Sequence, residues 1–275
     1  EKIQLKAEKI GFFDGAFKLA FSWSSPKLSF SEILEIFGKT PLPPYIKRSA
    51  ETSDVARYQT VFAKNEGSVA APTASLHFTE EVFRELEKVG VEQVKVNLHV
   101  GAGTFKPISS SVEEHIMHHE LFDVHIDELR RLSVLGNLIA VGTTAVRTVE
   151  SLFILAVQLK QNGVEDLSKP QIVTQWDWKS QPALFKDYHE AFSFLVSKCE
   201  ESGVERVHGY TSLMIVPGFK FKVIKGLITN FHMPKSTLLF LVSAFIGESW
   251  REVYSHALEN DYRFLSYGDS SLLIP

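Results

Sequence analysis

The chain has 275 residues, of which 44% are hydrophobic and 23% are charged, the proportions of an ordinary globular protein. A chain of this length can bury one large core and add a small second domain. Its formal net charge is −4, so a nucleic-acid partner would have to be held by a local basic patch rather than by overall charge.

Cysteine usage and hydropathy indicate the compartment. Cys199 is the only cysteine, which excludes an internal disulfide framework and is typical of a reducing cytosol. The sequence has no signal peptide, and no apolar run approaches the ~20 residues that cross a bilayer. We therefore expect a cytoplasmic protein with no membrane partner.

Residues 1–40 predict a small β domain and a connecting helix. Apolar and polar residues alternate on both sides of the Asp14-Gly15 dipeptide, which marks a hairpin turn. Ser31 is the expected cap of a helix over residues 32–37. The prolines of residues 41–45 (PLPPY) then form a rigid extended segment. We place a domain boundary there, with the larger domain over residues 41–275.

Alternating strands and helices from residue 94 onwards predict an α/β domain, which we expect to be barrel-like. Before residue 94, Thr79 is expected to cap a helix that ends at Gly90. Strands are expected at residues 94–100 and 138–141, and the last strand at 262–265. Ligands bind at the carboxyl ends of strands in such folds. Four polar loops at strand ends are therefore expected to converge, at residues 99–104, 142–144, 229–235 and 266–269.

The stretch over residues 225–249 is the centre of this interpretation. A strand ending near Ile228 is followed by the polar residues 229–235 (TNFHMPK). Ser236 then caps a helix that is apolar on nearly every side and therefore buried. The strand thus brings an amide, an imidazole and an ammonium group to the edge of the core. A polar loop that only joins two core elements is the alternative.

Two glycine turns follow predicted strands. Residues 101–105 (GAGTF) contain G-x-G, but no third glycine follows and Pro107 blocks an immediate helix, so we reject a dinucleotide site. Residues 142–144 (GTT) precede a helix that contains Arg147. Backbone amides and hydroxyls at a helix N-terminus bind anions, although threonine caps are common.

Residues 114–120 (EHIMHHE) are the densest titratable cluster. In a helix, His115 and His119 would share a face, as a metal pair would. The order is not H-E-x-x-H, and spacing identifies no third ligand. Proton transfer and a solvated cluster without function remain open.

Between residues 157 and 207 the alternation of strands and helices is lost, although Phe192, Leu195, Val196 and Cys199 mark an amphipathic helix, and the segment 175–178 (QWDW) has no assigned role. The alternation of strands and helices resumes near Leu213. Lys220 and Lys222 then alternate with apolar residues, with Lys225 beyond them, which predicts a strand with one basic face. The simpler interpretation is that these lysines lie on a solvated face of the sheet. The more specific one is that they contact phosphate groups.

Eight motifs together resemble one family, the S-adenosylmethionine:tRNA ribosyltransferase-isomerases of queuosine biosynthesis, and they occur in the family's order. They are PLPPYIKR (41–48), RYQTVFAK (57–64), VAAPTASLHF (69–78), LHVGAGTF (98–105), EHIMHHE (114–120), VGTTAVRTVES (141–151), TNFHMPKSTLL (229–239) and YRFLSYGDSSLLI (262–274).

The resemblance implies a barrel-like α/β catalytic domain and a smaller β-barrel-type domain that is only partly present in this chain. It also marks residues 157–207 as an insertion that is atypical of the family. The implied activity transfers and isomerises the ribosyl moiety of S-adenosylmethionine onto 7-aminomethyl-7-deazaguanine at the tRNA wobble position. Epoxyqueuosine forms, and adenine and methionine leave. S-adenosylmethionine is then a co-substrate, no prosthetic group is implied, and tRNA is the macromolecular partner.

The resemblance also suggests roles for individual residues. His232 and His77 are the first candidates for proton transfer, Glu114 and His115 the next, and Asp269 is a candidate partner of the sulfonium or the amine. Arg147, Thr143 and Thr144 suit the methionine carboxylate, and Tyr45 and Tyr58 suit stacking on a base. The other substrate-binding candidates are Thr73, Gly101, Gly103, Thr104, Asn230, Lys235 and Tyr267. Each could instead be a hydrogen-bonded structural residue.

Two alternative functions are kept. A metal-dependent hydrolase would use the histidines of residues 114–120 and would bind stoichiometric metal. A non-catalytic RNA-binding module would use Lys220, Lys222 and Lys225 and would bind tRNA without turnover.

Overall fold

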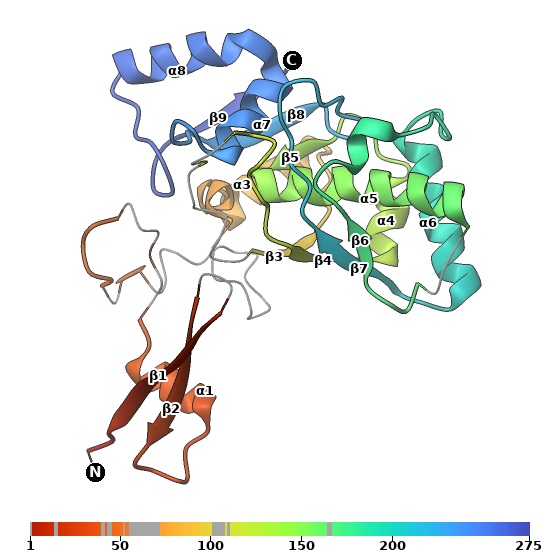
Figure 1. Ribbon diagram of the computed structural model, residues 1–275. Coiled ribbons are helices and arrows are strands. Elements are labelled where there is room, and N and C mark those ends of the chain that lie inside the picture. Colours follow the sequence, from red (N-terminus) through yellow and green to blue (C-terminus); the bar gives the residue numbers. More distant parts are fainter. Residues whose placement is uncertain are drawn as a thin grey trace. The chain divides into compact units, whose positions relative to one another are not determined.

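The computed structural model describes residues 2–13, 16–39, 42, 46–51, 53–54, 72–100, 108, 111–163 and 167–275. The chain divides into two compact units, Glu1–Pro41 and Leu42–Pro275. Both are mixtures of helices and strands (Figure 1).

Unit 1 is a hairpin followed by a helix. Strands β1 (Leu5–Phe13) and β2 (Ala16–Trp23) are antiparallel, as expected around residues 14–15. Helix α1 (Phe30–Phe37) is capped by Ser29, whose hydroxyl accepts from the amide of Glu32 at 3.3 Å. The Glu32 carboxylate accepts from the Ser29 amide at 2.7 Å in return. This reciprocal capping box has the correct three-residue spacing, so the prediction of Ser31 as the cap was wrong.

Unit 2 contains two open sheets of described strands. The four-stranded sheet has the order β3-β4-β7-β6, with β3 (Asn97–His99), β4 (Glu120–His125), β7 (Arg206–Thr211) and β6 (Gln171–Val173). Its β6–β7 pair is parallel and the other two pairs are antiparallel. The three-stranded sheet has the order β5-β8-β9, with β5 (Ile139–Val141), β8 (Gly226–Asn230) and β9 (Ser270–Leu273). Its β5–β8 pair is parallel and its β8–β9 pair antiparallel. Neither sheet closes into a barrel among these strands.

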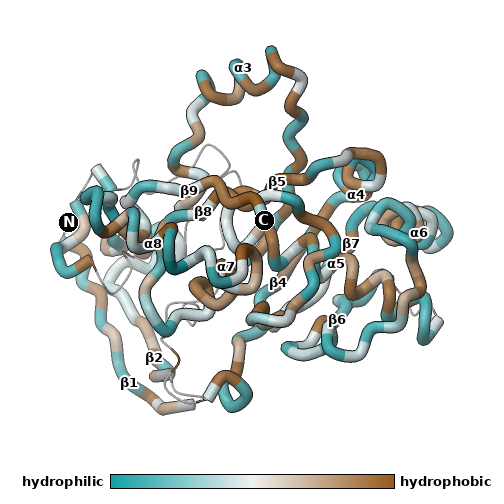
Figure 2. The backbone as a smooth tube through the Cα atoms, turned by 90° about the horizontal axis from the view of Figure 1, so that it is seen from above, coloured by the Kyte–Doolittle hydropathy of each residue, from teal (hydrophilic) through white to brown (hydrophobic). Residues whose placement is uncertain are grey.

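Helices cover these sheets and complete the core. They are α3 (Glu80–Lys88), α4 (Ile126–Leu132), α5 (Thr143–Asn162), α6 (Tyr188–Ser202), α7 (Thr237–Ile246) and α8 (Trp250–Glu259), with 3-10 turns η1 (Thr73–His77), η3 (Asp177–Ser180) and η4 (Gly247–Ser249). Helix α5 is buried along most of its length and packs against α6 and both sheets. Helix α3 buries no residue and projects from the rest of its unit (Figure 2). None of the helices in the described ranges is long and apolar enough to cross a membrane.

Two predicted helix caps are confirmed. The Thr79 hydroxyl accepts from the amide of Val82 at 3.3 Å at the start of α3, and the Ser236 hydroxyl accepts from the amide of Leu239 at 3.2 Å at the start of α7. Each satisfies one of the donors left open in a first helical turn.

Three element predictions were wrong. Residues 157–207 keep the alternation, since β6 and α6 lie there and contribute Val173, Phe192 and Leu195 to the core. The basic-faced strand does not form, because the Glu150 carboxylate accepts the amides of residues 222–224 that a neighbouring strand would otherwise bind. The final strand is β9 rather than residues 262–265, which have no regular secondary structure.

Candidate active site

The edge of the three-stranded sheet at the carboxyl ends of β5 and β8 collects three of the predicted loops. Because β5 and β8 are parallel, Gly142 and Asn230 leave the sheet on the same side. Strand β9 runs in the opposite direction, and its first residue, Ser270, pairs with Asn230. Residues 142–144, 230–232 and 267–269 therefore lie along one edge, as the sequence predicted. We call it the β8 edge.

Gly142 makes the turn from β5 into α5. Its amide donates to the Ile228 carbonyl at 2.8 Å, and its φ of 87° is a conformation that favours glycine. A Cβ added at Gly142 would lie 3.7 Å from the Cβ of Ala74 in η1. The 3-10 turn that contains Thr73 and His77 is thus packed onto the start of α5 and joins the β8 edge.

Asn230 connects η1 with the loop before β9. Its side-chain nitrogen donates to the carbonyls of Leu265 and Gly268, each at 3.2 Å, and lies 3.4 Å from Nε2 of His77. Asn230 is only 3% exposed, and its Oδ1 has no hydrogen-bond partner among the residues that the structure describes. An unsatisfied buried amide oxygen is uncommon and marks a position where a further donor would be stabilised.

His232 follows β8 directly and lies on the same edge. Its Nε2 is 2.8 Å from the Thr229 hydroxyl, and its backbone amide donates to the Tyr254 hydroxyl at 3.0 Å. Burial lowers the pKa of His232 to about 4, so its ring is neutral at physiological pH. Burial also raises the pKa of Tyr254 to about 12, so this phenol stays protonated.

Asp269 is held within its own loop. Arg263 donates to it from the guanidinium and from the backbone amide, each at 2.7 Å. The Arg263 side chain is the largest cause of a lowered Asp269 pKa, to which nearby His77 also contributes. Asp269 is therefore an ionised carboxylate whose charge is already partly balanced, which weakens but does not remove its attraction for a cation.

Tyr267 reaches a buried carboxylate that the sequence did not single out. Its hydroxyl donates to Asp54 at 3.0 Å, and both terminal nitrogens of Arg48 donate to the same carboxylate at 2.6 and 2.7 Å. The Arg48 side chain is the main reason that the Asp54 pKa lies far below its usual range. Asp54 thus connects the motif at residues 41–48 with the loop before β9.

Arg147 lies one turn into α5 and connects the β8 edge with the four-stranded sheet. One terminal nitrogen forms an ion pair with Glu120 at the start of β4, and its Nε donates to the Leu213 carbonyl at 3.1 Å. Both members of the pair are almost fully buried. The other terminal nitrogen, Nη2, has no hydrogen-bond partner within the described part of the chain. Thr143 and Thr144 begin the same helix, and Thr143 is buried.

The cluster over residues 114–120 is not helical. It passes from a turn into extended chain and then into β4, because the Gln175 side chain donates to the His115 carbonyl at 2.7 Å and accepts from the Met117 amide at 3.0 Å. Burial, followed by the neighbouring His118, lowers the pKa of His115. Glu114 is exposed, and no contact of the described residues joins it or His115 to His232. Within the described ranges, no three His, Cys, Asp or Glu side chains lie together as metal ligands would.

The remaining candidates divide into two groups. Thr73 begins η1, and Lys235 is exposed with a φ of 60° and a carbonyl that accepts from the Ile108 amide at 3.0 Å. The other candidates lie outside the described residues: Tyr45, Tyr58, Gly101, Gly103 and Thr104.

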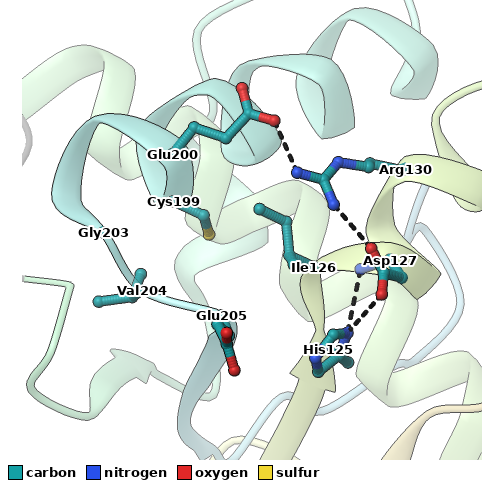
Figure 3. A pocket seen from close by; sticks show the side chains of 9 residues that line it. All are labelled: His125, Ile126, Asp127, Arg130, Cys199, Glu200, Gly203, Val204 and Glu205. Carbon is teal, nitrogen blue, oxygen red and sulfur yellow. Dashed lines mark hydrogen bonds and ion pairs between the residues drawn. The ribbon is translucent and has the colours of Figure 1, made fainter.

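A surface pocket of about 340 Å³ lies away from the β8 edge, between α4 and the end of α6 (Figure 3). Arg130 bridges Asp127 at 2.6 Å and Glu200 at 2.8 Å, and His125 accepts from the Asp127 amide. Burial raises the pKa of the Cys199 thiol to about 11, so it is protonated and poorly nucleophilic at neutral pH.

Comparison with known proteins decides the family. The family model described as "Queuosine biosynthesis protein" matches residues 3–273, nearly the whole chain. The chain belongs to this family of queuosine biosynthesis proteins.

Relatives within the queuosine biosynthesis family are longer than this chain. The S-adenosylmethionine:tRNA ribosyltransferase-isomerase of Nitrosomonas europaea is 40% identical over 263 residues, covering 94% of this chain and 61% of that protein. The protein of the same name from Polynucleobacter asymbioticus is 39% identical over 272 residues, covering 97% and 63%. The chain thus spans about three fifths of the length of these relatives.

One solved structure is also similar. The crystal structure of S-adenosylmethionine tRNA ribosyltransferase from Thermotoga maritima is 31% identical, with a TM-score of 0.46, and the match covers 74% of this chain and 51% of that one.

The residues that sequence reasoning missed are the partners of those it selected. Two of these partners, Thr229 and Tyr254, bond His232. The other two are Asp54, which bonds Tyr267, and Glu120, which pairs with Arg147. Their only signal was membership in, or closeness to, one of the quoted motifs. The pairings themselves depend on the fold.

Proposed function

We propose that this chain is part of an enzyme that transfers the ribosyl moiety of S-adenosylmethionine to tRNA and isomerises it. The acceptor is 7-aminomethyl-7-deazaguanine at the wobble position, the product is epoxyqueuosine, and adenine and methionine are released. The names of the relatives support the co-substrate, the tRNA and the class of reaction. The observation on which the proposal depends is the meeting of η1 with the ends of β5, β8 and β9, through Asn230, His77 and Gly142.

The chemistry requires proton transfers in a site shielded from water. The sulfonium acidifies the C5′ hydrogens of the ribose, so a nearby base assists in expelling adenine, which leaves more readily when protonated. The neutral imidazole of His232 can accept a proton, and Thr229 orients its ring. His77, bonded to Asn230, is the second proton-transfer residue. The tRNA amine is the nucleophile, so Cys199 takes no part.

The other substrate contacts follow from the same edge. Arg147 is already neutralised by Glu120, so it would meet the methionine carboxylate only through its free Nη2, with the first amides of α5 at Thr143 and Thr144. The open Oδ1 of Asn230 suits an N–H or O–H donor of the nucleoside. Asp269 and Tyr267 belong to the loop before β9 at the β8 edge, and Lys235 follows β8. Thr73, Tyr45, Tyr58, Gly101, Gly103 and Thr104 complete the proposed binding set, with Glu114 and His115 as further proton-transfer candidates.

The proposal includes a barrel-like catalytic domain, a β-barrel-type domain only partly present in this chain, and a cytoplasmic location. The division of the chain after Pro41 and the open β1–β2 hairpin are compatible with that organisation. We also propose that residues 157–207 are an insertion that is atypical of the family.

The test is incubation of the chain with S-adenosylmethionine and tRNA that contains the precursor base, followed by mass analysis of the digested nucleosides. We expect free adenine and epoxyqueuosine in equal amounts, and neither product with tRNA that lacks the precursor. A chelator should leave both unchanged, whereas the metal-dependent hydrolase alternative requires that it abolish activity. Folded chain that binds both substrates but releases no adenine would contradict the proposal.

A further inference from the structure

Residues 206–247 contain no Asp or Glu but five cationic side chains, in a chain whose formal net charge is −4. Three of these cations, Lys220, Lys222 and Lys225, are exposed on the loop between β7 and β8. The hydrogen bonds and ion pairs of the described residues give none of the three a carboxylate partner. A local excess of lysine over carboxylates is the feature by which an acidic protein holds a polyanion.

A rigid aromatic segment lies beside this loop, immediately after β6. The Asp177 carboxylate accepts from the Thr174 amide at 2.6 Å and from Gln158 of α5 at 2.8 Å, which fixes the turn. The Trp178 indole donates to the Met214 carbonyl at 3.1 Å. These bonds hold in place the QWDW segment, to which we assigned no role from the sequence.

Lys179 is the exposed cation of this segment. Its ammonium lies 3.9 Å from the centroid of the Trp176 ring, so it is held on the indole instead of moving freely in solvent. It has no carboxylate partner among the described residues. A cation that is fixed before binding loses less conformational entropy when it meets a phosphate.

The aromatic segment and the lysine loop form one surface. The Trp178 ring packs edge-on against Phe219 with centroids 5.3 Å apart, and Lys220 follows Phe219 directly. Glu150 accepts the amides of residues 222–224 and so fixes the backbone that presents Lys222. We define the aromatic–lysine surface as Trp176, Lys179, Lys220 and Lys222.

Helix α5 connects this surface with the β8 edge, and Gln158, which bonds Asp177, lies about 22 Å beyond Thr143 along that helix. Leu213 bonds Arg147 through its carbonyl, and the next residue, Met214, bonds Trp178. Glu150 lies about two helical turns, or about 10 Å, beyond Thr143 along α5. Lys225 is different, because its amide donates to the Leu138 carbonyl before β5, at the end of the sheet opposite Asn230.

We propose that the aromatic–lysine surface binds a part of the RNA substrate away from the nucleotide that reacts, with Lys179, Lys220 and Lys222 on phosphates and the Trp176 indole against an unpaired base. Lysines interleaved with aromatic rings are the chemistry by which proteins bind single-stranded nucleic acid. The inference rests on the proposed function for its partner, a tRNA. It adds the surface that holds the strand and assigns a role to residues 175–178.

The test is binding of a fluorescently labelled tRNA transcript to the whole chain across a series of salt concentrations. In the double variant Lys220→Ala/Lys222→Ala, we expect affinity to fall about tenfold and the slope of log affinity against log salt to decrease by roughly 1 to 2. Trp176→Ala should weaken binding about tenfold, and Trp176→Phe, which keeps a ring, by less than about threefold. Circular dichroism confirms that each variant is folded.

Lys225→Ala is the matched control, because it removes another exposed lysine from the same loop. We expect it to bind the transcript as the unaltered chain does. An equal loss for Lys225→Ala would assign binding to general charge and overturn the surface, and so would an unchanged affinity and salt slope in the double variant.

The same variants separate this inference from the proposed function. Loss of transcript binding in a chain that releases no adenine would support the surface and contradict the activity. Normal adenine release at low tRNA concentration in the double variant would support the activity and contradict the surface.

Discussion

The β8 edge and the pocket of Figure 3 are both rich in ionisable side chains, but they differ in how those side chains are held. At the pocket, Arg130 and Glu200 are about half exposed, and the two charges balance each other in a direct ion pair at the surface. At the β8 edge, Asn230 is buried, and partly buried His232 has a pKa far below its ordinary value. Counting only the described residues, the edge also retains a buried oxygen without a hydrogen-bond partner, and the pocket has none.

This difference teaches that a surface pocket is a poorer guide to catalytic residues than side chains whose burial or pKa is unusual. Exposed ion pairs contribute little, because solvent screens them and the side chains lose entropy in pairing. Buried polar groups retain strong interactions, and strongly shifted groups are concentrated at functional sites. The predictions below test whether the two regions differ in this way.

The largest effect is expected from Arg147→Met. It leaves the Glu120 carboxylate buried without its partner, which typically costs about 3–5 kcal/mol of unfolding free energy. Urea denaturation measures this change, and combining Arg147→Met with Glu120→Leu should recover most of it. A variant that unfolds like the unaltered chain would show that the pair is solvated, like those of the pocket.

The dependence of stability on pH is expected to split into two opposing parts. The pKa of His232 is lowered to about 4 from 6.5, so between these values the unfolded chain binds more protons and His232 makes stability rise with pH. Burial raises the pKa of Glu150 to about 7 from 4.5, so Glu150 makes stability fall as pH rises through that window. Each contribution is about 3 kcal/mol, and the two nearly cancel between pH 4.5 and 6.5.

Single substitutions should reveal the two parts. Relative to the unaltered chain, Glu150→Gln should gain stability as pH rises from 4.5 to 6.5, and His232→Asn should lose it. Urea midpoints at several pH values measure both slopes. If stability changes with pH in the same way in all three proteins, burial does not shift the pKa of either group.

Asn230→Ala is expected to have an intermediate effect. The substitution removes both bonds to the loop before β9, at a cost of about 1–3 kcal/mol, and exposes the Leu265 and Gly268 carbonyls. Hydrogen exchange should show faster exchange in residues 263–269 but not in α6. Unchanged exchange in that loop would contradict the role given to Asn230.

The smallest effect is expected at the pocket. Arg130→Ala removes both exposed ion pairs and should leave the urea midpoint and adenine release within experimental scatter. A clear loss of activity would reverse the comparison and make the pocket a functional site.

The sequence predicted local features better than distant pairings. Caps at Thr79 and Ser236 were predictable because each depends on a hydroxyl and an amide three residues apart. The meeting of residues 142–144 with 230–232 was predictable because parallel strands end on one side. Both follow from short-range rules that the fold does not override.

The errors came from side chains that bind a distant backbone. Residues 219–223 alternate like a strand, but Glu150 accepts the amides at 222–224. Gln175 keeps the His115 segment extended, so His115 and His119 do not share a helical face. From the sequence, Arg147 was a candidate for binding an anionic group, but in the fold its guanidinium is paired with Glu120. No spacing within one element reveals such partners.

The most direct test of the account compares two histidines under the same substitution. His232→Asn removes the imidazole at the β8 edge, and His125→Asn removes the one at the pocket, where asparagine still caps α4. With S-adenosylmethionine and precursor tRNA, we expect adenine release to fall at least about 100-fold for His232→Asn and to stay unchanged for His125→Asn. Near-normal release by folded His232→Asn, or an equal loss in both variants, would contradict the assignment of the reaction to the β8 edge.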